Sequence, residues 1–125
     1  MAAKEWAEID SAIRLYLEGM VYSQPEKLEQ VMHPSCVLAG KFEDLPDFNS
    51  RDTFIAAVKG SPGLAPGTPY LHKVELIDIA GDVAVARVTA DSFGTTFTDY
   101  LTFFKPDGRW QIVYKAFLDH AREKA

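Results

Sequence analysis

The segment "TDYLTFFKPDGRWQIVYKAF", residues 98–117, decides the fold of this chain. Two runs rich in aromatic and β-branched residues flank "KPDG", where Pro106 and Gly108 suit a type I turn followed by a bulge. The pattern predicts a β-hairpin in which Lys105 pairs with Arg109. Side chains alternate between the faces of a strand, so the turn also fixes which residues share a face.

One face of this hairpin carries an acid and a base among apolar residues. Counting in twos from the turn places Asp99 opposite Lys115, and their neighbours on that face are Phe97, Leu101, Val113 and Phe117. A surface pair of this kind contributes about 0.2–1 kcal/mol. A buried ion instead needs its partner, because isolated burial costs several kcal/mol. The pair is therefore either a surface salt bridge or a partly buried pair that lines a pocket or a subunit interface.

The rest of the chain places helices before strands. Apolar periodicity predicts a helix over residues 4–22, a short helix from Pro25 that ends before Pro34 and includes Met32, and a third from an N-cap at Ser50 to Gly60. Strands are expected over residues 36–42, 70–80, 83–93, 95–104 and 109–118. Residues 43–50, "EDLPDFNS", are rich in breakers and are predicted to be a loop. This order predicts the α+β class, with three helices packed on a strongly curved antiparallel sheet.

Composition limits the function classes. The 125 residues fit one domain, residues 1–125, and the net charge of -5 without a basic run argues against a nucleic-acid partner. No apolar stretch approaches the roughly 18 residues that span a bilayer, no signal-peptide pattern opens the chain, and the lone Cys36 cannot form an internal disulfide; these features favour the cytosol. His33, His72 and His120 lack metal-ligand spacing, so neither a metal nor another cofactor is expected.

Two segments resemble the nuclear transport factor 2-like (NTF2-like) superfamily, which includes ketosteroid isomerases, scytalone dehydratase and SnoaL-like polyketide cyclases. They are "YLEGMVYSQPEKLEQVMHPSCVLAG", residues 16–40, and "FTDYLTFFKPDGRWQIVYKAF", residues 97–117. Both look most like the branch labelled putative lumazine-binding, in which a helix leads into "HP" and a "DGxWxI…K" strand ends the fold. The resemblance implies a cone-shaped α+β barrel with a pocket at its open end, and commonly a homodimer.

The isomerase members of this superfamily imply roles for particular positions. Their oxyanion-donating tyrosine matches Tyr16, although a tyrosine on an apolar helix stripe also suits a core position. Their second acid falls near Asp99 or Tyr100, which point to opposite faces of the strand. Their general-base aspartate falls on Gly40, which has no side chain. Proton abstraction needs a base within hydrogen-bond reach, and position 40 offers none.

Two functions follow, from different classes. The first is a pocket protein for a small hydrophobic or cyclic ligand, with or without a simple acid/base step such as an isomerase, dehydratase or cyclase uses. Its catalytic candidates are Tyr16 and Asp99, and its full set of pocket candidates is Tyr16, Met20, Met32, Phe54, Val58, Asp99, Leu101, Val113, Lys115 and Phe117. The alternative is a non-catalytic association domain that dimerises through an apolar sheet face. The two differ in whether the face with Asp99 and Lys115 lines the interior or meets a second subunit.

Overall fold

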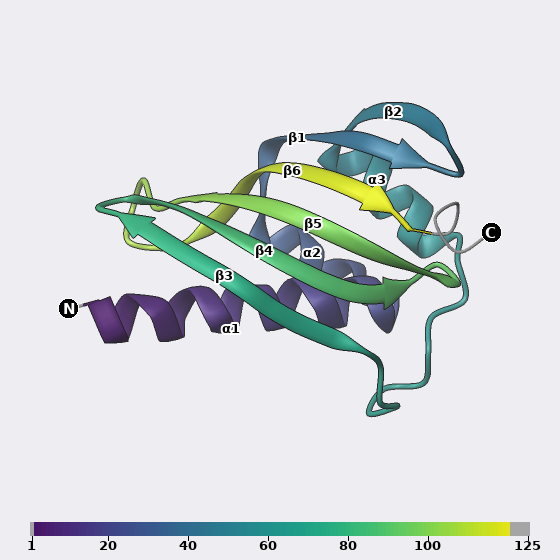
Figure 1. The fold of residues 1–125 in the computed structure, drawn as a ribbon, viewed down its shortest axis with the longest axis horizontal. Coiled ribbons are helices and arrows are strands. Elements are labelled where there is room, and N and C mark those ends of the chain that lie inside the picture. Colours follow the sequence, from purple (N-terminus) through teal and green to yellow (C-terminus); the bar gives the residue numbers. More distant parts are fainter. Residues whose placement is uncertain (1, 121–125) are drawn as a thin grey trace.

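The computed structural model describes residues 2–120, which form an α+β fold of three helices and one six-stranded sheet (Figure 1). The helices are α1 (Ala2–Val21), α2 (Pro25–Val31) and α3 (Arg51–Lys59). The strands are β1 (Met32–Phe42), β2 (Leu45–Ser50), β3 (His72–Ala80), β4 (Val83–Ser92), β5 (Thr95–Phe104) and β6 (Gln111–Asp119). The sheet is curved and open, with strand order β2-β1-β6-β5-β4-β3. The predicted fold class is confirmed.

The sheet is an antiparallel meander extended by one parallel pairing. Strands β3 to β6 pair in sequence order, and β1 then lies parallel to β6 with β2 antiparallel to β1. The sheet is therefore mixed, where the sequence indicated only antiparallel pairing. No short turn joins β1 to β6, so their relative direction is set by the crossover through α3 and the meander rather than by local turn chemistry.

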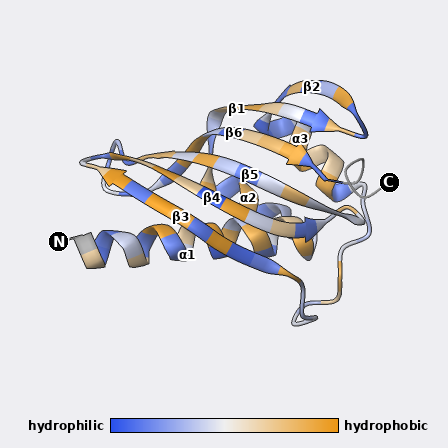
Figure 2. Cartoon of the chain, viewed as in Figure 1, coloured by the Kyte–Doolittle hydropathy of each residue, from blue (hydrophilic) through white to orange (hydrophobic). Residues whose placement is uncertain are grey.

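The helices cover the inner face of the sheet and enclose the core. Helix α1 presents Ile9, Ile13, Tyr16 and Leu17 inward at helical spacing, and each of these side chains is fully buried. Helix α3 begins as the sequence indicates, because the Ser50 hydroxyl accepts a hydrogen bond from the Thr53 amide. Figure 2 shows apolar and polar residues interspersed along the strands, as expected for a sheet that faces a core on one side.

Within residues 43–50, Leu45–Ser50 form a strand, so the predicted loop is wrong for these six residues. A tight turn reverses the chain at Glu43 and Asp44, both of which have positive φ. The following residues pair with β1, and Pro46 is tolerated because β2 is the edge strand and needs no amide there. The breaker residues in this segment are therefore compatible with a strand at the edge of the sheet.

The start of β1 also differs from the prediction. Helix α2 ends at Val31, and Met32 is the first residue of β1 rather than part of the helix. The pairing of β1 with β6 shifts register between Met32 and Val37, a stretch that contains Pro34. Proline has no backbone N–H to donate a hydrogen bond to the neighbouring strand, and the irregular segment accommodates it within β1.

The register of the β5–β6 hairpin differs from the one that the turn predicts. Lys105 and Arg109 are not paired; the last pair is Phe104 with Gln111, and a bulge between Thr102 and Phe103 leaves Val113 without a partner in the ladder. Asp99 consequently lies opposite Phe117, and Lys115 lies opposite Leu101. The predicted direct pairing of Asp99 with Lys115 is wrong, because the longer loop and the bulge together move β6 along β5. Both side chains nevertheless stay on the inner face, in diagonal positions.

Candidate functional site

A pocket of about 380 Å³ opens beside α3 on the inner face of the sheet. Its wall is mostly apolar and aromatic, and its lining residues are Met20, Leu38, Phe42, Asp47, Asn49, Thr53, Phe54, Ala57, Ser61, Phe93, Phe97, Lys115 and Phe117. The rings of Phe42, Phe93, Phe97 and Phe117 contact one another, with centroid separations of 6.0 to 6.4 Å. A pocket of this size and lining suits a small, largely apolar ligand.

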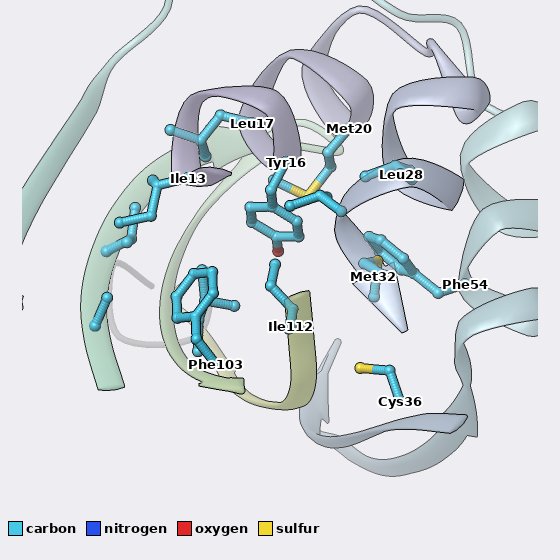
Figure 3. Packing of buried hydrophobic residues seen from close by; sticks show 14 of the residues in the cluster. Ile13, Tyr16, Leu17, Met20, Leu28, Met32, Cys36, Phe54, Phe103 and Ile112 are labelled. Carbon is cyan, nitrogen blue, oxygen red and sulfur yellow. The ribbon is translucent and has the colours of Figure 1, made fainter. Parts of the chain in front are cut away.

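The basic group at this pocket is Lys115, which is supported from behind by Asp99 and Tyr16. The Lys115 Nζ atom lies 4.0 Å from Asp99 Oδ2. The same carboxylate oxygen accepts a 2.6 Å hydrogen bond from the Tyr16 hydroxyl. All three side chains are buried, with relative exposures of 5% for Lys115, 2% for Asp99 and 0% for Tyr16. Figure 3 shows the Tyr16 ring within the core, close to Met20 and Ile112.

The surroundings of Lys115 and Tyr16 disfavour the charged form of each side chain. Burial lowers the pKa of the Lys115 ammonium, and the nearby Asp99 carboxylate offsets only part of that effect. Burial, followed by the charge of Asp99, raises the pKa of the Tyr16 hydroxyl well above its ordinary value. The Lys115 Nζ also lies 4.1 Å from the ring centroid of Phe54 and 5.4 Å from that of Phe117. The Lys115 amino group therefore lies among aromatic rings and near one carboxylate. None of these groups replaces the hydrogen bonds that water would give it.

Asp47 and Asn49 supply polar groups at the same pocket, and the sequence reasoning missed both. They alternate along β2, directly opposite Gly40 and Leu38 of β1, so they face inward. The Asn49 amide donates a 2.9 Å hydrogen bond to the Asp47 carboxylate. The two-residue spacing in "DFN" is the available signal, but the breaker residues around it favour a loop and hide it.

Gly40 lies where any side chain would collide with β6. A Cβ atom added there would come within 2.1 Å of the Phe117 carbonyl oxygen and 2.7 Å of the Phe117 ring. The position that the isomerase resemblance assigns to a general base therefore has no room for one. Asp47 pairs with Gly40 in the antiparallel ladder of β1 and β2, so its carboxylate is the one placed beside the general-base position.

The structure divides the predicted pocket residues into separate groups. Met20, Phe54, Lys115 and Phe117 line the pocket. Tyr16, Asp99, Met32, Val58 and Leu101 are buried in the core behind it. Val113 belongs to neither group, because it is the bulged residue of β6 and is half-buried away from the core cluster.

A larger hollow of about 860 Å³ adjoins the pocket and shares Met20, Phe42, Ser61 and Phe93 with it. The connection between α3 and β3 and the β4–β5 turn form most of its wall. Its one charged lining residue is Asp91, which is exposed and bonded to Thr96. The hollow is therefore an approach to the Lys115 pocket rather than a second charged site.

Comparison with known proteins identifies the family. The family model described as "Putative lumazine-binding" matches residues 4–118. The chain belongs to this family. Its fold is that of the NTF2-like superfamily: an NTF2-like protein of unknown function from Silicibacter pomeroyi DSS-3 is 25% identical, with a TM-score of 0.88 over 95% of this chain and 98% of the other. No curated protein matches this sequence.

Other solved NTF2-like proteins agree on the fold. One from Shewanella baltica OS155 is 20% identical, with a TM-score of 0.85 over 96% of this chain and 97% of the other. One from Methylobacillus flagellatus KT is 26% identical, with a TM-score of 0.79 and 94% of each chain covered. Both are proteins of unknown function, so for this NTF2-like chain the site itself has to indicate the chemistry. Within residues 2–120, no helix is long and apolar enough to cross a membrane.

Proposed function

We propose that this protein binds a small, planar, largely apolar ligand that carries a carbonyl or carboxylate oxygen. The observation that supports it is Lys115, a buried amino group at a pocket whose wall is mostly apolar and aromatic. Within residues 2–120, no protein group accepts a hydrogen bond from Lys115 Nζ. An oxygen atom of a ligand would supply the missing acceptor, and the phenylalanine rings would pack on its body.

An acid/base step, if the ligand is also a substrate, would use the groups that reach the pocket. Lys115 and Asp47 line it, whereas Tyr16 and Asp99 lie behind Lys115 and bond to each other. The proposed roles are therefore proton donation or charge stabilisation by Lys115 and proton acceptance by Asp47. Tyr16 and Asp99 position the lysine rather than touch the ligand.

Calorimetric titration with 4-phenylbutanoate and with lumazine tests this proposal. Ala57 lines the pocket and its neighbour Ala56 does not, although both are exposed on α3. We expect Ala57→Trp to fill the pocket and abolish binding, while Ala56→Trp leaves binding unchanged. Binding that survives Ala57→Trp would contradict the proposal. So would a wild-type protein that binds neither compound.

A second proposal is that the outer face of the sheet forms a homodimer interface. Large apolar side chains are exposed there in neighbouring strands: Val37 of β1, Tyr114 and Leu118 of β6, Tyr100 and Phe104 of β5, and Val83 of β4. The helices lie on the other face and leave this patch uncovered (Figure 1). Contiguous exposed apolar surface of this kind favours protein association. This interface is compatible with a ligand pocket, because the two use opposite faces of the sheet.

A further inference from the structure

We propose that Lys115 captures its ligand covalently, by forming an imine with the carbonyl carbon of an apolar aldehyde or ketone. This inference rests on the proposed binding function and narrows its ligand class from oxygen-bearing compounds to carbonyl compounds. Under this proposal, the Lys115 amino group acts as a nucleophile and not only as a hydrogen-bond donor to the ligand.

The position of Lys115 meets the geometric needs of such a nucleophile. Its side chain reaches the pocket from β6, and Nζ is held between the rings of Phe54, Tyr16 and Phe117 at 4.1, 5.2 and 5.4 Å. The 4.0 Å separation from Asp99 exceeds a hydrogen bond. The carboxylate therefore lies near Nζ without accepting a hydrogen bond from it, and an incoming carbonyl carbon can approach Nζ from the pocket.

The groups around Lys115 favour the neutral amine that the reaction requires. Burial lowers the pKa of Lys115, and the carboxylates of Asp99 on β5 and Asp47 on β2, together with Cys36 on β1, act in the opposite direction without restoring the ordinary value. Tyr16 on α1 is neutral over a wide pH range because its pKa is raised. A desolvated lysine in an apolar pocket is an activated nucleophile for carbonyl groups.

Asp47 can hold the proton that the reaction moves, because its carboxylate lines the same pocket as Lys115. Asp99 stays behind Lys115: its Oδ2 atom is bonded to Tyr16, and its buried Oδ1 atom has no hydrogen-bond partner among the described residues. The ammonium passes one proton to Asp47, and the free amine adds to the carbonyl carbon to give a carbinolamine. The proton from Asp47 then goes to the carbinolamine oxygen, which leaves as water while the C–N bond becomes a protonated imine. The step releases one water and needs no oxidant or reductant.

An aromatic 1,3-diketone, benzoylacetone, is a direct probe because its imine rearranges to a stable vinylogous amide that absorbs in the near-ultraviolet. We expect one adduct per chain, with the mass of one probe less one water, and peptide mapping of the wild-type protein should place it on Lys115. Lys59 is exposed on α3 and serves as the comparison. Lys115 should react faster than Lys59 near neutral pH, because the lowered pKa of Lys115 leaves more of it as the neutral amine.

Matched variants separate the covalent step from binding. Lys115→Met should abolish the adduct, and Lys59→Met should leave it unchanged. Pre-incubation of the wild-type protein with 4-phenylbutanoate should slow labelling of Lys115 but not of Lys59, a comparison that needs no variant to fold. The labelling rate of Lys115 should also reach its plateau at a pH below the ordinary lysine pKa, because burial lowers the pKa of Lys115.

The outcomes distinguish the two proposals. If 4-phenylbutanoate binds but benzoylacetone gives no adduct, or labels exposed lysines as readily as Lys115, the imine inference is wrong and the binding function stands. If neither compound binds or reacts, the binding function itself fails.

Discussion

At the residue scale, the candidate site depends on three buried side chains, Asp99, Lys115 and Tyr16. One carboxylate oxygen of Asp99 faces both the lysine and the phenol. Asp99 Oδ2 accepts a 2.6 Å hydrogen bond from the Tyr16 hydroxyl and lies 4.0 Å from Lys115 Nζ. Removal of one member leaves the others without the partner that makes their burial tolerable. The isolated surface salt bridge, one of the alternatives that the sequence left open, is excluded by the burial of both side chains.

Lys115→Met should therefore destabilise the protein more than loss of a surface pair would. We expect a fall in the free energy of unfolding on the order of 3 kcal/mol, because the Asp99 carboxylate keeps its burial and loses its cation. Urea unfolding measures the effect. The matched control is the triple variant Lys115→Met/Asp99→Leu/Tyr16→Phe, which removes all three polar groups and should be more stable than the single variant. A single variant as stable as the parent would show that the pair is not electrostatically coupled.

The phenol of Tyr16 should make the protein sensitive to alkaline pH. Its pKa is raised in the folded state above the ordinary value of 10.0. Above that value the unfolded chain loses this proton before the native state does, so the free energy of unfolding falls as pH rises. Wild-type protein should therefore lose stability above pH 10 more steeply than Tyr16→Phe. Tyr114→Phe, which alters an exposed tyrosine, should follow the wild-type curve; parallel curves for all three would contradict this assignment.

At the scale of elements, the pocket depends on the close approach of β1 and β6. Gly40 and Phe117 are partners in this parallel pairing, and the carbonyl of Phe117 occupies the space that a Cβ on residue 40 would need. Because that obstacle is backbone rather than a flexible side chain, it cannot move aside without disturbing the ladder. Phe117 also lines the pocket, so this close approach involves part of the pocket wall.

Gly40→Ala should consequently lower stability by about 1–3 kcal/mol, the usual range for overpacking. It should also weaken binding of 4-phenylbutanoate, because Phe117 must shift. Thermal unfolding and calorimetry report these effects. Gly60→Ala is the matched control, since a Cβ there meets nothing closer than 3.6 Å. Equal melting temperatures for the two variants would show that β1 and β6 separate more easily than their packing indicates.

At the scale of the whole molecule, the curved sheet separates two surfaces for which we propose different uses. The inner face, under the helices, holds Asp99, Lys115 and the pocket. The outer face exposes Tyr100 and Tyr114, with the Arg87 guanidinium 5.8 Å from the Tyr100 ring centroid. The alternation of side chains along β5 and β6 would thus let a single hairpin serve both the proposed binding site and the proposed interface.

The outer face should hold two copies of the chain together at micromolar concentration. Introducing like charges at the centre of the patch, in Tyr100→Glu/Tyr114→Glu, should give a monomer that still binds 4-phenylbutanoate. Light scattering coupled to size-exclusion chromatography measures the mass of both proteins. A wild-type protein that is monomeric at high micromolar concentration would contradict the dimer, as would a charged variant that remains dimeric.

The sequence by itself determined the α+β class, the N-cap at Ser50 and the presence of an acid and a base on one face of the last hairpin. These are local properties: helical periodicity, capping chemistry and strand alternation act over a few residues. The family resemblance also came from contiguous motifs, and the match over residues 4–118 confirmed it.

The tertiary structure alone decided how these pieces form a site. The β6 bulge at Val113 replaced the predicted pairing of Asp99 with Lys115 by a diagonal contact, because long-range packing rather than the "KPDG" turn fixed the register. The edge strand β2 formed only because β1 offered it a ladder, and it brought Asp47 to the pocket. Burial of Lys115 likewise depends on α1 and α3, which lie far from it in the sequence. Such contacts leave no local signature, so the sequence could name Asp99 and Lys115 but not their environment.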